Sequence, residues 1–192
     1  MMKHTERNDA LLIVNVQNGF LNSHTKHLPA RIEFLASWFD TVVISRYYNC
    51  PQEPSEDLIH LLVDWAAIAP EEIEFDHAFE APRGAINIAS PTYSILTTDL
   101  MSMLTERNIG HVNIAGMDTD ISIRMCATEL LIAGFDVSIH GDYCASTLGP
   151  WRHMSALKHM QDLLVSQDVL KQETRSHHVK HDKLPLGRGA RH

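Results

Sequence analysis

The chain alternates short, continuously apolar runs with longer stretches in which apolar residues recur at helical spacing. Residues 11–16 form an apolar run typical of a strand that is buried on both faces. Residues 120–133 show instead the three- and four-residue spacing of an amphipathic helix, which a glycine at position 134 ends. The same patterns predict strands at 11–16, 41–45, 85–89, 111–115, 135–140 and 168–171, and helices at 31–38, 57–67, 97–107, 120–133 and 154–164.

This order of elements predicts an α/β fold, a three-layer α/β/α sandwich around a six-stranded parallel doubly wound sheet. In such sheets ligands bind beyond the carboxyl ends of the strands. Asn15, Ser90 and Ser122 fall at those ends, so we expect them to meet in one pocket. Each also has a structural interpretation, because Asn and Ser side chains often satisfy backbone groups at strand ends and helix starts.

Three segments are similar to the isochorismatase-like cysteine hydrolases. They are residues 10–20 (ALLIVNVQNGF), residues 90–94 (SPTYS) and residues 116–123 (GMDTDISI). The stretch 141–146 with the histidine at 153 resembles the last strand, loop and helix of that family. The resemblance implies a catalytic aspartate, lysine and cysteine at three positions where this chain has Asn15, Ser90 and Ser122.

These three replacements remove the groups that the family's chemistry needs. The Asn15 amide cannot take up a proton at neutral pH. Ser90 carries no charge and is shorter than a lysine. The Ser122 hydroxyl needs a separate base before it can attack a carbonyl, and base assistance alone is worth about 10²- to 10⁴-fold. Only the backbone amides that would hold an oxyanion are independent of these changes.

The resemblance also places a set of binding residues around the expected pocket. They are Met117, Asp118, Tyr93, Arg46, Trp65 and His153. Core packing is the alternative interpretation for the tryptophan, and a surface or capping role for the histidine. The related nicotinamidases bind a metal through an Asp and closely spaced His residues after the second strand, where this chain reads RYYNC at 46–50. We therefore expect no metal and no other cofactor.

Charge is distributed unevenly along the 192 residues, whose formal net charge is −8. Residues 175–192 hold five Lys or Arg and one Asp, a net +4, which leaves −12 for residues 1–174. We interpret residues 1–174 as one hydrolase-like domain and 175–192 as a flexible, basic, His-rich tail. An acidic domain argues against nucleic-acid binding. The absence of a long apolar run and of a signal-peptide pattern predicts a cytoplasmic protein without a membrane span.

Three functional hypotheses follow. The first is a pseudoenzyme, a homo-oligomer that binds a small molecule or a partner without hydrolysing it. The second is a hydrolase of amide, ester or vinyl-ether bonds in which Ser122 attacks with help from Asp118 or Asp120. The third is a structural or assembly subunit. Asn for Asp and Ser for Cys are also replacements used to trap substrates, whereas Ser for Lys is not, which favours a natural origin for the changes.

Overall fold

A computed structural model describes residues 8–49 and 68–164. The chain divides into two compact units, residues 1–157 and 158–192, and the fold and both sites below lie in the first. Several predictions fall outside the described residues. They are Trp65, Cys50, the helix at 57–67, the strand at 168–171 and the tail at 175–192.

The described residues form one five-stranded sheet with the order β3-β2-β1-β4-β5. Its strands are β1 (Asn8–Val14), β2 (Val42–Tyr47), β3 (Ile86–Ser90), β4 (Ile109–Met117) and β5 (Asp136–Ala145). All four pairings between neighbouring strands are parallel. The predicted parallel, doubly wound sheet is therefore confirmed with five strands in the described part of the chain.

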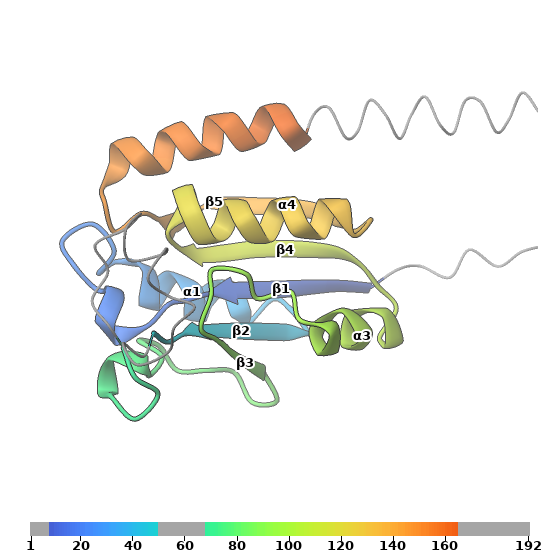
Figure 1. Cartoon of the computed structure of the whole chain (residues 1–192), viewed down its shortest axis with the longest axis horizontal. Coiled ribbons are helices and arrows are strands. Elements are labelled where there is room, and N and C mark those ends of the chain that lie inside the picture. The colour runs from blue at the N-terminus through green and yellow to red at the C-terminus, as the bar shows by residue number, and fades with distance from the viewer. Residues whose placement is uncertain (1–7, 50–67, 165–192) are drawn as a thin grey trace, which may run out of the picture. The chain divides into compact units, whose positions relative to one another are not determined.

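Helices cover both faces of this sheet. Among the described residues these are α1 (Leu28–Ala36), α3 (Thr98–Glu106) and α4 (Arg124–Ile132). A further helix begins at residue 150. The connection through α1 leads from β1 to β2, and the connection through α4 leads from β4 to β5 in the opposite direction along the sheet. Because such crossovers are right-handed, the two helices lie on opposite faces, as Figure 1 shows. The described residues include no helix long and apolar enough to cross a membrane.

Burial follows position in the sheet. The central strand β1 is buried continuously from Ala10 to Val14, as its apolar run predicts. The edge strand β5 is half-exposed over most of its length, which explains why its polar residues are tolerated. β5 also extends beyond the predicted end at residue 140, because Cys144 and Ala145 pair with the last residues of β4.

The predicted helix at 120–133 differs from the observed one in its first turn. Residues Thr119–Ile123 form a single π-helical turn, η3, and α4 begins only at Arg124. The amide of Ile123 donates to the carbonyl oxygen of Asp118 at 3.2 Å, a bond across five residues. This wide turn carries Ser122 and leaves its side chain fully buried.

Candidate functional site

The carboxyl ends of β1 and β4 form the point where the sheet changes direction. β1 is followed by a connection to one side and β4 by a connection to the other, so a crevice is expected between them. Val14 at the end of β1 pairs with Gly116 near the end of β4. Asn15 follows the first strand and η3 follows the second. Two of the three predicted site positions thus flank this point, here called the β1–β4 edge.

The two strands approach each other closely at Gly116. This glycine has φ 133°, and a Cβ added to it would overlap the backbone carbonyl oxygen of Val14. A side chain is therefore excluded both by conformation and by space. The glycine thus lets β4 lie against Val14, the residue that precedes Asn15.

Asn15 is held in one orientation by β2. Its backbone is left-handed, with φ 51°, and its side chain is 1% exposed. The Ser45 hydroxyl donates to Asn15 Oδ1 at 2.8 Å, and it accepts from the backbone N–H of Asn15 at 3.1 Å. Asn15 Nδ2 is buried and has no hydrogen-bond partner among the described residues. The side chain thus presents a fixed donor, and its oxygen is occupied.

Ser90, the last residue of β3, uses its hydroxyl within its own loop. Its Oγ donates to the carbonyl oxygen of Ser94 at 2.8 Å and accepts from the amide of Thr92 at 3.2 Å. This is the arrangement of a strand-ending serine turn. The geometry supports the structural interpretation of Ser90.

No base is hydrogen-bonded to Ser122 among the described residues. Its Oγ is buried and lacks a hydrogen-bond partner in the described part of the chain. Asp118 Oδ1 accepts from the amide and the hydroxyl of Thr147, at 2.9 and 2.6 Å. Asp120 accepts from Ser146 at 2.6 Å and pairs with Arg152 at 3.6 Å. Neither carboxylate is hydrogen-bonded to Ser122.

Asp118 is the most perturbed acid of this edge. It stands just before η3 with φ 58° and is almost completely buried. Burial raises its pKa to about 6, Asp120 adds to the rise, and the two bonds from Thr147 oppose it. Its Oδ2 has no partner among the described residues. A buried carboxylate oxygen without a donor is costly, and perturbed acids of this kind concentrate at functional sites.

Tyr93 connects the loop after β3 with this edge. Burial, followed by the negative charge of Asp118, raises the pKa of Tyr93 to about 12. The Tyr93 ring stacks on the Tyr47 ring, with centroids 5.8 Å apart and an interplanar angle of 14°. Two stacked aromatic rings thus lie on the β2–β3 side of this edge.

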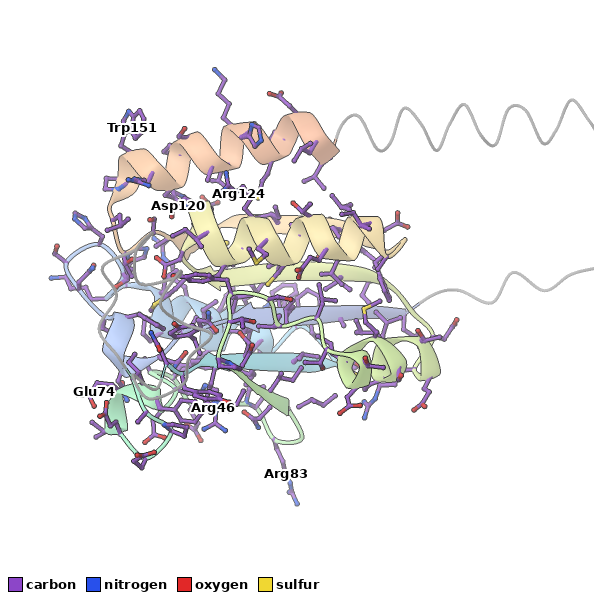
Figure 2. The ribbon with its side chains drawn as sticks, in the orientation of Figure 1. Arg46, Glu74, Arg83, Asp120, Arg124 and Trp151 are labelled. Carbon is purple, nitrogen blue, oxygen red and sulfur yellow. The ribbon has the colours of Figure 1, made fainter. Side chains whose placement is uncertain are left out.

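The remaining predicted residues are placed differently. Met117 is fully buried and belongs to the hydrophobic core. The Arg46 guanidinium lies 4.4 Å from the centroid of the Phe75 ring, at the same end of the sheet as Asp120 (Figure 2). His153 lines a separate cavity, and its Nδ1 lies 2.8 Å from the Thr119 hydroxyl.

This cavity has a volume of about 360 Å³ and is lined neither by Asn15 nor by Ser90 or Ser122. Sequence reasoning found His153 but missed its partners in the cavity, His24, His27 and Arg31. Their spacing was an available signal, because residues three and four apart face the same way at the start of a helix.

A family model described as "Isochorismatase domain" matches residues 9–171. The chain belongs to the isochorismatase family. The comparison with curated proteins gave no match.

Several solved structures share the fold. An isochorismatase-like hydrolase from Alkaliphilus metalliredigens is 16% identical, with a TM-score of 0.69 over 80% of this chain and 91% of that one. Pyrazinamidase of Pyrococcus horikoshii in complex with zinc is 19% identical, with a TM-score of 0.70 over 81% and 95%. N-carbamoylsarcosine amidase from Thermoplasma acidophilum is 20% identical, with a TM-score of 0.62 over 76% and 88%.

The zinc of the Pyrococcus structure raises the question of whether this chain fits a metal. Among residues 8–49 and 68–164, no group of three or more His, Cys, Asp or Glu side chains could hold a metal ion. Arg46 to Asn49, at the end of β2, supply one guanidinium, two phenols and an amide, which are not a preferred donor set for zinc. The described residues therefore do not fit a zinc site.

Proposed function

We propose that this isochorismatase-family protein is a pseudoenzyme that binds a small carboxamide at the β1–β4 edge without hydrolysing it. The observation that carries the proposal is a set of three buried polar atoms without partners among the described residues: Asn15 Nδ2, Ser122 Oγ and Asp118 Oδ2. Buried polar atoms in folded proteins are nearly always hydrogen-bonded, so three such atoms at the ends of two neighbouring strands suggest a ligand.

The chemistry of the three atoms favours a carboxamide. Asn15 Nδ2 is a donor, the Ser122 hydroxyl can donate, and Asp118 Oδ2 is an acceptor when ionised. A primary carboxamide has the complementary groups, a carbonyl oxygen that accepts and an amino group that donates. The stacked Tyr47 and Tyr93 rings favour a flat, aromatic remainder of the ligand. Structures named as nicotinamidase and pyrazinamidase share the fold, which agrees with such a ligand.

The absence of turnover is inferred from what surrounds the same atoms. Asn15 cannot act as a base, and its oxygen already accepts from Ser45. The Ser90 hydroxyl is bonded within its own loop. Within residues 8–49 and 68–164, Ser122 has no carboxylate or imidazole as a hydrogen-bond partner. An unassisted serine is a weak nucleophile, so binding should not lead to hydrolysis.

The test is titration calorimetry with nicotinamide and pyrazinamide, combined with a sensitive assay for released ammonia. We expect binding without ammonia. Replacing Asp118 by Asn exchanges an acceptor for a donor and should weaken binding roughly tenfold or more. The matched control Asp99→Asn removes an exposed acid from α3 and should leave binding unchanged.

Two results would overturn the proposal. Ammonia release that Ser122→Ala abolishes would establish the serine hydrolase instead. A lack of binding by both amides would exclude a carboxamide site and favour the structural or assembly role.

A further inference from the structure

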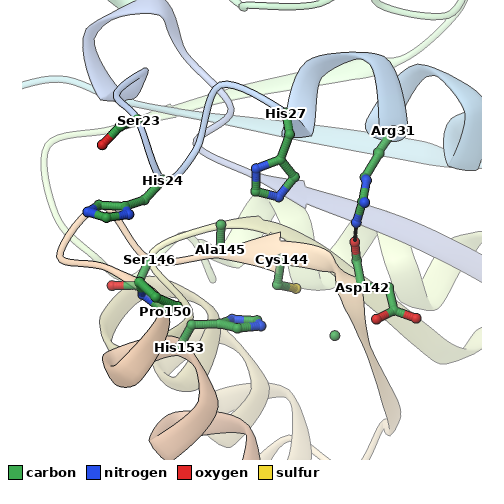
Figure 3. Close-up of a pocket in the computed structure, with 11 residues that line it drawn as sticks. Ser23, His24, His27, Arg31, Asp142, Cys144, Ala145, Ser146, Pro150 and His153 are labelled. Atoms are coloured by element: carbon green, nitrogen blue, oxygen red, sulfur yellow. Dashed lines mark hydrogen bonds between the residues drawn. The ribbon is translucent and has the colours of Figure 1, made fainter.

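The His–Arg cavity, which contains His153, is formed by four segments of the first unit. The segment that leads into α1 contributes His24 and His27, and α1 itself contributes Arg31. The end of β5 and the residue after it contribute Gly141, Asp142, Cys144, Ala145 and Ser146, and the start of the last helix contributes His153. Figure 3 shows the three imidazoles and the guanidinium around the cavity, with the Cys144 thiol between them. The volume of about 360 Å³ is within the range of small-molecule sites.

The cavity concentrates positive and hydrogen-bond-donating groups in an otherwise acidic chain. Arg31 is permanently charged, and its Nη1 donates to the backbone carbonyl oxygen of Asp142 at 2.8 Å, which fixes the guanidinium. Asp142 supplies the one carboxylate among the lining residues that the structure describes. Burial raises the pKa of the Cys144 thiol to about 12, so the sulfur adds no negative charge.

The histidines experience this excess of positive charge. Desolvation lowers the pKa of His27, and the charge of Arg31 lowers it further. Desolvation also lowers the pKa of His153, and His27 adds to the effect, while Asp120 and Asp142 oppose it. Asp120 is itself paired with Arg152 and bonded to Ser146. An anion between the histidines and Arg31 would relieve this repulsion.

We propose that the His–Arg cavity is a second binding site, which takes a small organic molecule through its phosphate or carboxylate group. Arg31 supplies a fixed charge with donors beyond the one bound to Asp142, because a guanidinium has five N–H groups. His153 uses Nδ1 toward Thr119, which leaves Nε2 for the cavity. Donors that converge from α1, its leading segment and the last helix suit an oxyanion with several acceptor oxygens.

The first experiment is calorimetric titration with sulfate at constant ionic strength. Sulfate is a useful probe because it stays a dianion across the histidine range, so any dependence of its affinity on pH belongs to the protein. We expect binding to be at least several-fold tighter at about pH 5.5 than at about pH 8, because protonated imidazoles add charge. Acetate and glycerol 3-phosphate, titrated in the same way, decide between a carboxylate and a phosphate ligand.

The variants locate the site. Arg31→Gln should weaken sulfate binding roughly tenfold or more, and Arg31→Lys should retain most of it, because a point charge is kept. Arg83→Gln is the matched control, since Arg83 is exposed and extends away from the ribbon in Figure 2. Unchanged circular dichroism would show that Arg31→Gln still folds.

Three outcomes would overturn this inference. They are the absence of binding by all three anions, an equal loss with Arg83→Gln, and an affinity for sulfate that does not change with pH. These outcomes do not depend on the carboxamide site. Asn15, Asp118 and Ser122 do not line the His–Arg cavity, and the variants at Arg31 and Arg83 do not change them.

Discussion

The β1–β4 edge and the His–Arg cavity belong to the same fold but differ in how their polar groups are buried and hydrogen-bonded. At the edge, Asn15, Asp118 and Ser122 are almost completely buried, and one polar atom of each is without a partner among the described residues. In the cavity, the polar groups border open volume, and Arg31 and His153 are anchored by hydrogen bonds. Because its polar groups are buried, the edge should lose stability on small substitutions. The polar groups of the cavity are partly exposed, so substitutions there should cost less, but the stability of this region should depend on pH.

The largest difference between the two regions should appear at their glycines. Gly116→Ala at the edge would place a methyl group against the Val14 backbone, and it should lower the free energy of unfolding by about 4 kcal/mol or more. Gly149→Ala beside the cavity also meets a positive φ, of 103°, but only ordinary contact with the His24 ring. It should cost about 1 kcal/mol. Urea denaturation measures both, and equal losses would contradict the close approach at Gly116.

The buried charge of the edge gives the next effect. The folded pKa of Asp118 is about 6, above its ordinary value of 3.8. Between these pH values the folded protein binds the extra proton, so the free energy of unfolding falls as pH rises through the window. Asp118→Asn keeps an acceptor for Thr147 and suits a left-handed φ. It should stabilise the protein by about 2 to 3 kcal/mol at neutral pH.

That gain should shrink as pH falls toward 3.8 and disappear below about pH 3, where Asp118 is protonated in both the folded and the unfolded state. Denaturation curves at several pH values provide the measurement, with Asp99→Asn as the exposed control. A loss of stability, or a gain that is independent of pH, would show that the carboxylate is not desolvated as described. A gain in stability together with weaker carboxamide binding would indicate that the charge is retained for function.

The sequence predicted the central fold because strands buried on both faces have continuous apolar runs, as at residues 10–14. The family resemblance is confirmed by the matched domain model. The π turn at Thr119–Ile123 could not be predicted, because the spacing of residues 120–133 also fits a regular helix. It follows the end of β4, three residues after the close approach of Gly116 to Val14, which is a contact that only the folded chain contains.

The partners of the site residues were also beyond the sequence. Ser45 orients Asn15 from 30 positions away, and Thr147 holds Asp118 from 29 positions away. No local pattern relates such residues. The cytoplasmic location, the oligomer and the roles assigned to Asn15, Ser90 and Ser122 stay predictions.

A smaller difference in stability is expected between two serine substitutions at the edge, one of a hydrogen-bonded serine and one of a serine without a partner among the described residues. Ser45→Ala removes a hydroxyl that both donates to and accepts from Asn15, and it should cost about 1 to 3 kcal/mol. Ser122→Ala removes a buried hydroxyl without a partner among the described residues, so the change should stay within about 0.5 kcal/mol or be slightly stabilising. Thermal denaturation compares the two directly. A large loss with Ser122→Ala would mean that its hydroxyl is satisfied in the folded protein.

The smallest expected change in the free energy of unfolding comes from the histidines of the cavity. Its dependence on pH is opposite to that of Asp118. The pKa values of His27 and His153 lie below the ordinary 6.5, so the unfolded chain binds more protons in that window. Their contribution to stability is therefore complete above pH 6.5 and is lost as pH falls toward the folded values.

Denaturation in an Asp118→Asn background isolates this acid-induced loss from the opposing trend at the edge. Sulfate should reduce the loss, and His27→Gln should flatten it, whereas the control His159→Gln, which changes a histidine that does not line the cavity, should not. If both substitutions left the same slope, the histidines of the cavity would not be the groups that titrate, and the contrast in pH response between the two regions would fail.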